Sequence, residues 1–336
     1  MSLSAERPSR AASELHPGIW HLPVPLTGHS IGHVNVYALV TAEGPLLVDT
    51  GWGTPETFTA LTALLRDLGA EPADVRGVVS THMHPDHCGL ARTLRDAGGA
   101  WFAMHEVDAR GLREVYADRP AHVEANLRWL REAGAPGDYA PRMVSRLDEI
   151  ASRATGLAPD RPLADGDTVS LGDWDLAAVH TPGHTPGHLC LFEQKTGTLF
   201  TGDHVLTRIN ASPTYRPGTS DDPVGDYLAS LDRLASLPVR RTLPGHQRPI
   251  ADLAARLTEV RAYHERRIAQ VTGAVRAGSR TAWETAATLT RSRPWPELSE
   301  TSRVVAVGET YAHLRHVALR GEVVAHDGEP VRWTAV

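Results

Sequence analysis

Cysteine and long hydrophobic runs are scarce in this chain of 336 residues. Cys88 and Cys190 are its only cysteines, too few for a disulfide framework or for the thiolate set of a structural zinc or iron–sulfur site. The first residues lack the apolar segment of a secretory signal, and no stretch approaches the roughly 18 apolar residues of a membrane-spanning helix. We therefore expect a cytoplasmic protein that does not enter a membrane.

Lysine is almost absent as well, because Lys195 is the only one among the 34 basic residues. The 40 acidic residues outnumber them and give a net charge of −6, so the charge balance does not indicate nucleic acid or an anionic membrane as a partner. A content of 41% hydrophobic and 22% charged residues is ordinary for a globular protein. The length allows one large domain and a small one.

Histidine is frequent, and its most informative cluster is the run HMHPDH at residues 82–87, which follows the apolar stretch 75–80. Side chains two residues apart in extended backbone share a face, so His82 and His84 can reach one metal ion. The turn at Pro85 then lets Asp86 and His87 point toward a second ion. One motif could therefore serve two metals.

Three further candidate ligand segments follow downstream. They are His184 in TPGHTPGH (181–188), Asp203 in TGD (201–203) and His246 in PGH (244–246). Each lies at a predicted strand end or turn, where a rigid scaffold presents functional groups. Imidazole and carboxylate donors suit Zn²⁺, which is our first candidate, although the same donors accept iron or manganese.

With LVDTG at 47–51, these motifs in this order resemble the metallo-β-lactamase superfamily of hydrolases, and hydroxyacylglutathione hydrolases in particular. The resemblance spans roughly residues 16–250. It implies an α+β fold, a four-layer αββα sandwich, with two metal ions at one edge between the two sheets.

The resemblance also implies a role for each residue of the motifs. One group would bind the first ion, a second group would bind the other ion, and one carboxylate would bridge both. These are, in order, His82, His84 and His184; Asp86, His87 and His246; and Asp203.

Three residues of the motifs have expected roles beyond metal binding. Asp86 is the predicted catalytic group, placed to orient the attacking hydroxide or to pass its proton. Asp49 resembles the buried acid that steadies the ligand loops, and His188 is expected to support its own loop, since metal ligands need outer partners. His84 favours zinc, because members with two iron ions for redox chemistry generally place a glutamate at that position.

Hydrophobic periodicity and glycine and proline breaks predict the organisation of the chain. Residues 1–15 are polar and expected to be flexible, and residues 16–250 form the catalytic domain. Within it, residues 104–158 read as helical and polar, which indicates a helical cap near the metal edge.

Residues 251–336 are predicted to form three helices and a hairpin around Asp327-Gly328. This arrangement resembles a small winged-helix-like module, found in a branch of the superfamily with a single-strand endoribonuclease and several thioesterase-like enzymes. Its arginines are interleaved with glutamates such as Glu259 and Glu265, which favours a solvated face over a nucleic-acid surface.

The leading hypothesis is a dinuclear zinc hydrolase that cleaves a thioester or ester, with a small-molecule acyl substrate. A lactonase is an alternative, although many lactonases of this family carry tyrosine where Leu206 stands, three residues after Asp203. A metal-dependent single-strand endoribonuclease and a non-catalytic binding protein are further alternatives. The oligomeric state is left open, and a homo-oligomer is compatible with the sequence.

Residues that would contact substrate are harder to identify than ligands. Four candidates lie on loops that the implied fold brings toward the metal edge: Trp52, His33, Arg208 and Tyr215. Each of them could equally serve packing.

Overall fold

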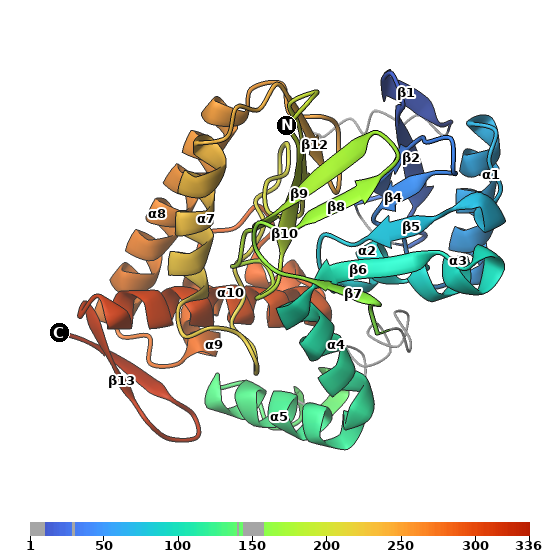
Figure 1. The fold of residues 1–336 in the computed structure, drawn as a ribbon. Helices are drawn as coiled ribbons and strands as arrows, with labels where there is room; N and C mark the ends of the chain where they lie inside the picture. The colour runs from blue at the N-terminus through green and yellow to red at the C-terminus, as the bar shows by residue number, and fades with distance from the viewer. Residues whose placement is uncertain (1–10, 29–30, 140, 144–157) are drawn as a thin grey trace.

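The computed structural model describes residues 11–28, 31–139, 141–143 and 158–336. Its centre is formed by two sheets that lie face to face, with helices on the outer side of each (Figure 1). The predicted four-layer arrangement is therefore confirmed.

The first sheet contains seven strands in chain order, of which β1 to β4 are antiparallel and β4 to β7 are parallel. Its strands are β1 (Ser13–His16), β2 (Ile19–Pro25), β3 (His33–Leu39), β4 (Leu46–Val48), β5 (Gly77–Val79), β6 (Trp101–His105) and β7 (Arg161–Leu163). Strand β1 begins at Ser13, inside the segment 1–15 for which the sequence predicts flexibility. Residues 1–10 of that segment lie outside the described residues.

The second sheet has the strand order β12-β11-β10-β9-β8, antiparallel except for the pair β11 and β12. Its strands are β8 (Thr168–Leu171), β9 (Trp174–His180), β10 (Leu189–Glu193), β11 (Thr198–Gly202) and β12 (Arg241–Pro244).

Alternation along the strands separates the layers. In β3, Val34 and Val36 pack toward the outer helices, whereas Tyr37 and Leu39 point into the space between the sheets. This period of two is what a strand with both faces buried requires. The side chains between the sheets come from both of them, which makes that layer the common core of the sandwich.

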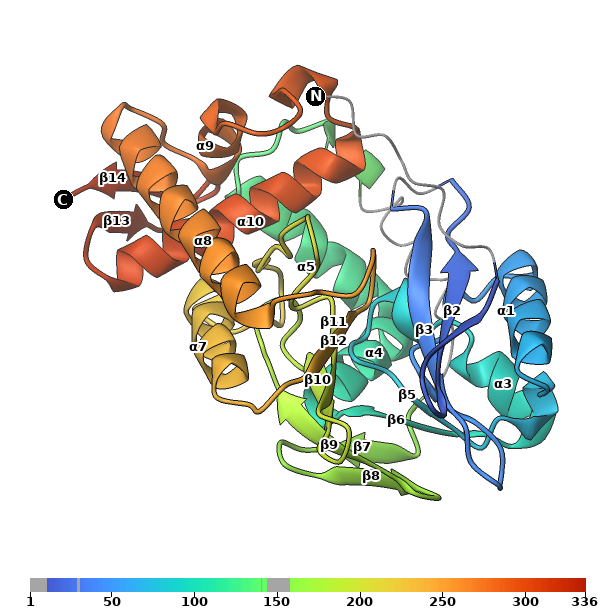
Figure 2. The same cartoon turned by 90° about the horizontal axis from the view of Figure 1, so that it is seen from above.

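Helices α1 (Pro55–Asp67) and α3 (Ala91–Gly98) cover the first sheet, with the short α2 (Pro85–Cys88) before α3. Helix α1 starts as predicted, because Thr54 accepts a hydrogen bond from the Thr57 amide (3.3 Å) and Pro55 occupies the first helical position. Helices α7 (Pro223–Ala235) and α8 (Leu253–Arg276) cover the second sheet (Figure 2). Single turns of 3₁₀ helix lie at Pro72–Asp74 and Trp295–Glu297.

The predicted helical cap contains α4 (Glu106–Ala117) and α5 (Arg119–Glu132). Its first two residues belong to β6 instead, and residues 140 and 144–157 lie outside the described residues. Trp129 and Leu130 of α5 are buried in a core that they share with the C-terminal helices. The cap is thus packed into the molecule on the side of the C-terminal module.

The C-terminal module continues after α8 with α9 (Ala282–Thr288), α10 (Glu300–Leu319) and the hairpin of β13 (Val323–His326) and β14 (Arg332–Ala335). Thr281 and Glu284 form the predicted capping box at the start of α9. Helix α10 is buried on most of its circumference, which explains why it shows little amphipathic pattern.

The module shares its core with the cap and also packs against the second sheet. Leu257 and Val260 of α8 pack with Cys190 and Leu199 of the second sheet. The predicted boundary at residue 250 therefore marks a change in sequence character, while α8 forms part of the outer layer of the sandwich.

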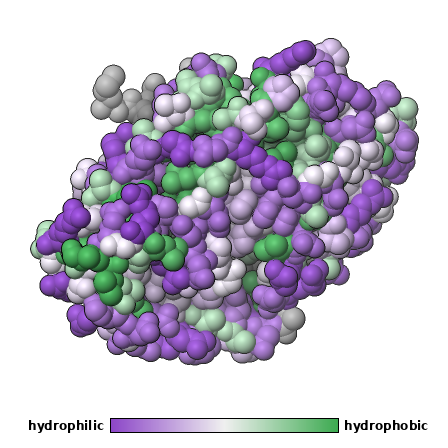
Figure 3. Space-filling model, turned by 60° about the vertical axis from the view of Figure 1, so that its left-hand side comes forward, coloured by the Kyte–Doolittle hydropathy of each residue, from purple (hydrophilic) through white to green (hydrophobic). Residues whose placement is uncertain are grey.

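The molecular surface in Figure 3 is mostly hydrophilic, with scattered apolar patches. Exposed large apolar side chains such as Leu319 are isolated positions, which is normal for a globular surface. No helix in the described part of the chain combines the length and apolarity needed to cross a membrane.

Because α8 closes the second sheet, Leu257→Ala should lower the free energy of unfolding by about 2–5 kcal/mol, the usual cost of a buried leucine. The matched change Leu319→Ala, at a leucine that is 63% exposed, should change it by no more than about 0.5 kcal/mol. Denaturant unfolding of both variants measures the difference. Equal effects would show that α8 does not cover a core shared with the second sheet.

Candidate metal centre

The four predicted ligand segments each follow the carboxyl end of a strand. In the second sheet, β9 and β11 both run antiparallel to β10, and β12 runs parallel to β11. The carboxyl ends of β9, β11 and β12 therefore lie at one edge, where they present His184, Asp203 and His246. The HMHPDH run follows β5 of the first sheet, and the Leu189 amide donates to the Thr81 carbonyl (2.7 Å) to join the sheets there.

The first group of side chains is formed by three histidines. His84 Nδ1 lies 2.9 Å from His82 Nε2 and 3.1 Å from His184 Nε2. Ligands around a tetrahedral zinc ion at about 2.0–2.1 Å lie about 3.3–3.4 Å apart. The three nitrogens therefore face a common point with spacings close to those of a metal site.

The second group combines one acid with two histidines. Asp86 Oδ2 lies 3.3 Å from His246 Nε2 and 3.7 Å from His87 Nε2. These atoms, like those of the first group, all lie within 4.8 Å of one another.

Asp203 lies between the two groups and faces both. Its Oδ1 is 3.5 Å from His246 Nε2 and 3.6 Å from His87 Nε2, whereas its Oδ2 is 3.8 Å from His184 Nε2. A side chain at Gly245 would bring its Cβ within 2.8 Å of Asp203 Oδ1, so this carboxylate needs glycine beside it. The two oxygens point in the directions that a bridging ligand would use.

The imidazoles of His87 and His246 have partners at their outer nitrogens, which aim their inner nitrogens at the centre, whereas the buried His184 Nδ1 has no hydrogen-bond partner among the described residues. His87 Nδ1 contacts Asp49 Oδ2 (2.8 Å) and His246 Nδ1 contacts the His33 carbonyl oxygen (2.8 Å). His87 Nε2 and Asp203 Oδ1 are buried and have no hydrogen-bond partner among the described residues. Buried ligand atoms without a hydrogen-bond partner, on side chains that are held in place by outer contacts, fit a divalent metal ion.

The pKa values of the acids and of the first histidine group are lowered for different reasons. Burial, reinforced by neighbouring histidines, lowers the pKa of His82 well below its usual value and that of His84 to about 3. Burial alone would raise the pKa of Asp86 and Asp203, but the imidazoles of His87 and His246 lower both. Against the effect of burial, the acids in turn raise the pKa of His87 and His246, so the metal-binding forms, neutral imidazole and ionised carboxylate, are favoured in the first histidine group and in the acids.

Asp49 and His188 have the contacts expected of supporting residues. Asp49 is buried, adopts a positive φ of 62°, and accepts from the Thr81 amide (2.8 Å) in addition to His87. The Asp203 amide donates to His188 Nε2 (3.2 Å), and His188 Nδ1 contacts Thr181 Oγ1 (2.9 Å). Asp49 thus joins the two ends of the HMHPDH segment, and His188 joins the segment of Asp203 to that of His184.

Asp108 was not identified from the sequence. This buried acid of α4 accepts hydrogen bonds from the Met83 amide (2.9 Å), the Thr185 hydroxyl (2.7 Å) and the Gly187 amide (2.6 Å). It therefore ties the loop of His82 and His84 to the loop of His184. Burial outweighs these bonds and raises the pKa of Asp108 to about 6.

Arg256 of α8 is a second supporting residue that the sequence did not reveal. Its guanidinium donates to the carbonyl oxygens of Leu206 (2.7 Å) and Ile209 (2.8 Å) and to Asn210 Oδ1 (2.7 Å). These acceptors lie on the segment that follows Asp203. No local pattern distinguishes Asp108 or Arg256 from the other charged residues of the chain, because only the tertiary fold buries them.

The predicted substrate contacts lie in different surroundings. His33 is next to the centre through its carbonyl contact with His246, and burial lowers the pKa of its ring to about 4. Arg208 is exposed, and its amide donates to Gln247 Oε1 (2.8 Å). Trp52 packs against the core under the first sheet, and Tyr215 stacks on Tyr311 of α10 with ring centroids 4.7 Å apart. Contacts of Trp52 and Tyr215 are thus those of packing residues, and substrate contact by any of the four stays a prediction.

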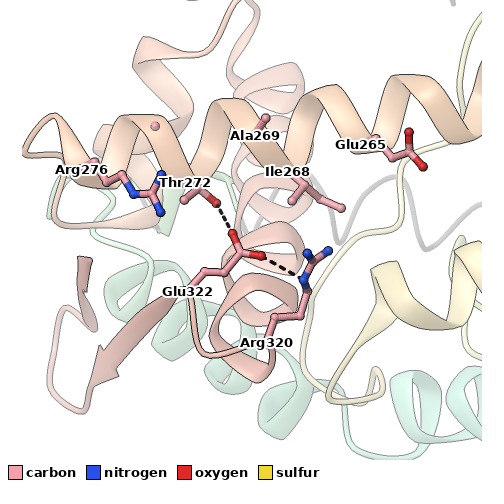
Figure 4. Close-up of a pocket in the computed structure, with 8 residues that line it drawn as sticks. Glu265, Ile268, Ala269, Thr272, Arg276, Arg320 and Glu322 are labelled. Atoms are coloured by element: carbon pink, nitrogen blue, oxygen red, sulfur yellow. Dashed lines mark hydrogen bonds and ion pairs between the residues drawn. The ribbon is translucent and has the colours of Figure 1, made fainter. Parts of the chain in front are cut away.

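A groove of about 530 Å³ lies on the C-terminal module, between α8 and the turn after α10 (Figure 4). Glu322 forms part of its wall, paired with Arg320 (2.9 Å) and bonded to the Thr272 hydroxyl (3.3 Å). None of the residues that line it is a predicted ligand, so the groove is not part of the centre.

Comparison with known proteins shows similarity over most of the chain. The model of the metallo-beta-lactamase superfamily matches residues 30–246. A probable metallo-hydrolase, YqjP of Bacillus subtilis, is 29% identical over 241 residues, 68% of this chain and 72% of that protein. The acyl-coenzyme A thioesterase MBLAC2 of Gallus gallus is 31% identical over 221 residues, 63% of this chain and 72% of that protein.

Solved structures extend the similarity to the C-terminal module. The metallo-beta-lactamase family protein TTHA1429 of Thermus thermophilus superimposes with a TM-score of 0.84 at 32% identity, covering 96% of this chain and 100% of that one. A beta-lactamase domain protein of Burkholderia ambifaria reaches a TM-score of 0.77 at 26% identity, covering 97% and 93%. The fold is therefore shared over nearly the whole chain.

Because Asp108 links two ligand loops, Asp108→Asn should lower metal affinity by about 10- to 100-fold, the usual effect of losing an outer partner. The side-chain amide of asparagine would point an N–H group at one of the three groups that now donate hydrogen bonds to Asp108. Competition with a chromophoric chelator measures the affinity. The exposed Asp96, which pairs only loosely with Arg92 (3.7 Å), offers the control Asp96→Asn. An unchanged affinity in Asp108→Asn would contradict the linking role.

Proposed function

Because the chain belongs to the metallo-β-lactamase superfamily, we propose that it is a dinuclear metal-dependent hydrolase that cleaves a thioester or ester. The observation that supports this most directly is the pair of three-residue groups with Asp203 between them. The superfamily is metal-dependent, and zinc is the metal we propose, with iron and manganese as the other candidates.

In this proposal His82, His84 and His184 hold one ion, and Asp86, His87 and His246 hold the other, with Asp203 shared. Two bound ions would supply a water whose pKa is lowered to near 7 and would polarise the carbonyl group to be cleaved. The protein's part is to fix the donors: Asp49 and the His33 carbonyl orient His87 and His246 from outside.

Asp86 is the residue that we propose handles the proton. Its carboxylate is only 19% exposed, and His246 and His87 keep its pKa below its usual value, so it is ionised at neutral pH. An ionised carboxylate beside the nucleophilic water can orient it and accept its proton, provided the two lie within hydrogen-bond distance.

A thioester is favoured over other substrates by the similarity to the MBLAC2 thioesterases. The lactonase alternative is weakened further, because Leu206 is buried and contributes its carbonyl to Arg256. The nuclease alternative has the shared C-terminal module in its favour and the net charge of −6 against it. The partner that we propose is therefore a small-molecule acyl substrate, since hydrolysis of a thioester or ester requires one.

Hydrolysis of a CoA thioester, S-lactoylglutathione, a lactone and a short single-stranded RNA should be compared in parallel with the purified protein. We expect thioester cleavage that a chelator abolishes and that added Zn²⁺, Mn²⁺ or Fe²⁺ restores. Consumption of RNA or lactone alone would replace the proposed substrate class. Full thioesterase activity in protein stripped of metal would contradict the metal-dependent mechanism.

Asp203→Ala should lower both the metal content and the activity, the latter by at least about 100-fold, because it removes the one carboxylate that faces both groups. Asp173→Ala, at an exposed acid, is the control and should leave both unchanged. Metal analysis and initial rates measure the two effects. A variant Asp203→Ala with normal metal content and activity would show that Asp203 is not a bridging ligand.

A further inference from the structure

Arg216 is a half-buried arginine on the segment between Asp203 and α7, and its backbone is fixed in a turn. The Arg216 amide donates to Thr219 Oγ1 (3.2 Å), and the Thr219 hydroxyl donates back to the Arg216 carbonyl (2.8 Å). The guanidinium carbon lies 5.1 Å from the centre of the Trp129 ring in the helical cap. The side chain is therefore held between two parts of the fold.

Within the part of the chain that the structure describes, no anionic side chain neutralises this guanidinium. The acids that follow it in the chain are committed elsewhere: Asp221 pairs with Arg315 (2.7 Å), and Asp222 contacts His316 (3.0 Å) and caps α7. Asp226 accepts from Ser220. Among the described residues, the Arg216 guanidinium has the Trp129 ring as its contact and neither an ion pair nor a hydrogen bond.

Two other arginines with little exposure, Arg256 and Arg267, have oxygen partners for their guanidinium groups. Arg256 donates to three oxygens of the Asp203 segment, and Arg267 lies 3.6 Å from Glu309. Arg216 differs because burial is the sole influence on it, lowering its pKa to about 10. A half-buried charge without a partner is less favourable than a paired one, and an anion in contact with the guanidinium would supply that partner.

The turn at Arg216 lies close to two segments of the metal centre. Thr219 and Ser220, with Pro223 and Asp226, line a small hollow together with Gly183 and Pro186, which flank His184. In addition, the segment that carries Arg216 begins at Asp203. The turn therefore lies against one ligand loop and is continuous with another.

We propose that Arg216 binds an anionic group of the substrate, a phosphate or a carboxylate carried by the thiol half of the thioester. Guanidinium presents a planar fork of donors that matches both oxyanions. This inference rests on the proposed thioesterase function. The two sources of the anion are a thiol with phosphate groups, such as coenzyme A, and one with carboxylates, such as glutathione.

The kinetic test compares charged thioesters with the neutral S-acetyl-N-acetylcysteamine. Arg216→Gln removes the charge but keeps most of the aliphatic stem, and should raise KM for the charged thioester by about 10- to 100-fold. Activity on the neutral thioester should not change, and Arg216→Lys should recover part of the loss. Arg66→Ala, at an exposed arginine of α1, is the control.

Separate assays with acetyl-CoA and S-lactoylglutathione identify the anion. A loss confined to acetyl-CoA assigns a phosphate to Arg216, and a loss confined to S-lactoylglutathione assigns a carboxylate. Equal losses on the charged and neutral thioesters would overturn the inference, because they would show that the substitution disturbs the centre and not an anion contact.

Calorimetric binding of S-methyl-coenzyme A and S-methyl-glutathione to the metal-loaded protein gives a readout without turnover. We expect one of them to bind about 10-fold or more weakly to Arg216→Gln than to the wild type. Equal affinities would overturn the inference even if thioesters are hydrolysed. If no thioester is hydrolysed but binding still depends on Arg216, the anion site stands and the proposed function is wrong.

Discussion

The structure depends on the burial of seven metal-competent side chains within a few ångströms of one another, where the two sheets meet. Five imidazoles and two carboxylates are held with facing atoms 2.9–3.8 Å apart, and two of those atoms, His87 Nε2 and Asp203 Oδ1, have no hydrogen-bond partner among the described residues. Such a cluster gains little from its own hydrogen bonds and is costly to desolvate. A bound cation would satisfy these donors together, which gives the arrangement a physical reason.

Three parts of the fold fix the loops that carry these side chains. Asp49 of the first sheet aligns His87 with the Thr81 backbone, Asp108 of the cap ties the two loops of the first histidine group, and Arg256 of α8 holds the segment after Asp203. The cap and the C-terminal module therefore belong to the scaffold of the centre. This explains why the module shares its core with the cap and the sandwich.

Local sequence signals were sufficient to find the segments that the fold brings together, because each motif combines a strand end with a metal-competent residue and a glycine or proline turn. The same holds for the caps of α1 and α9, where Thr54 and Thr281 act as the sequence predicts. Asp108 and Arg256 carry no such signal, since their burial depends on contacts with residues far away in the chain. Tyr215 stays a predicted substrate contact, and its stacking on Tyr311 is a contact that its loop position does not reveal.

The most direct test of the central claim is anomalous X-ray scattering from crystals of the protein, measured at the absorption edge of the metal that it retains. The account predicts two peaks, one enclosed by His82, His84 and His184 and the other by Asp86, His87 and His246, with the Asp203 carboxylate between them. A single peak, or peaks away from Asp203, would contradict it.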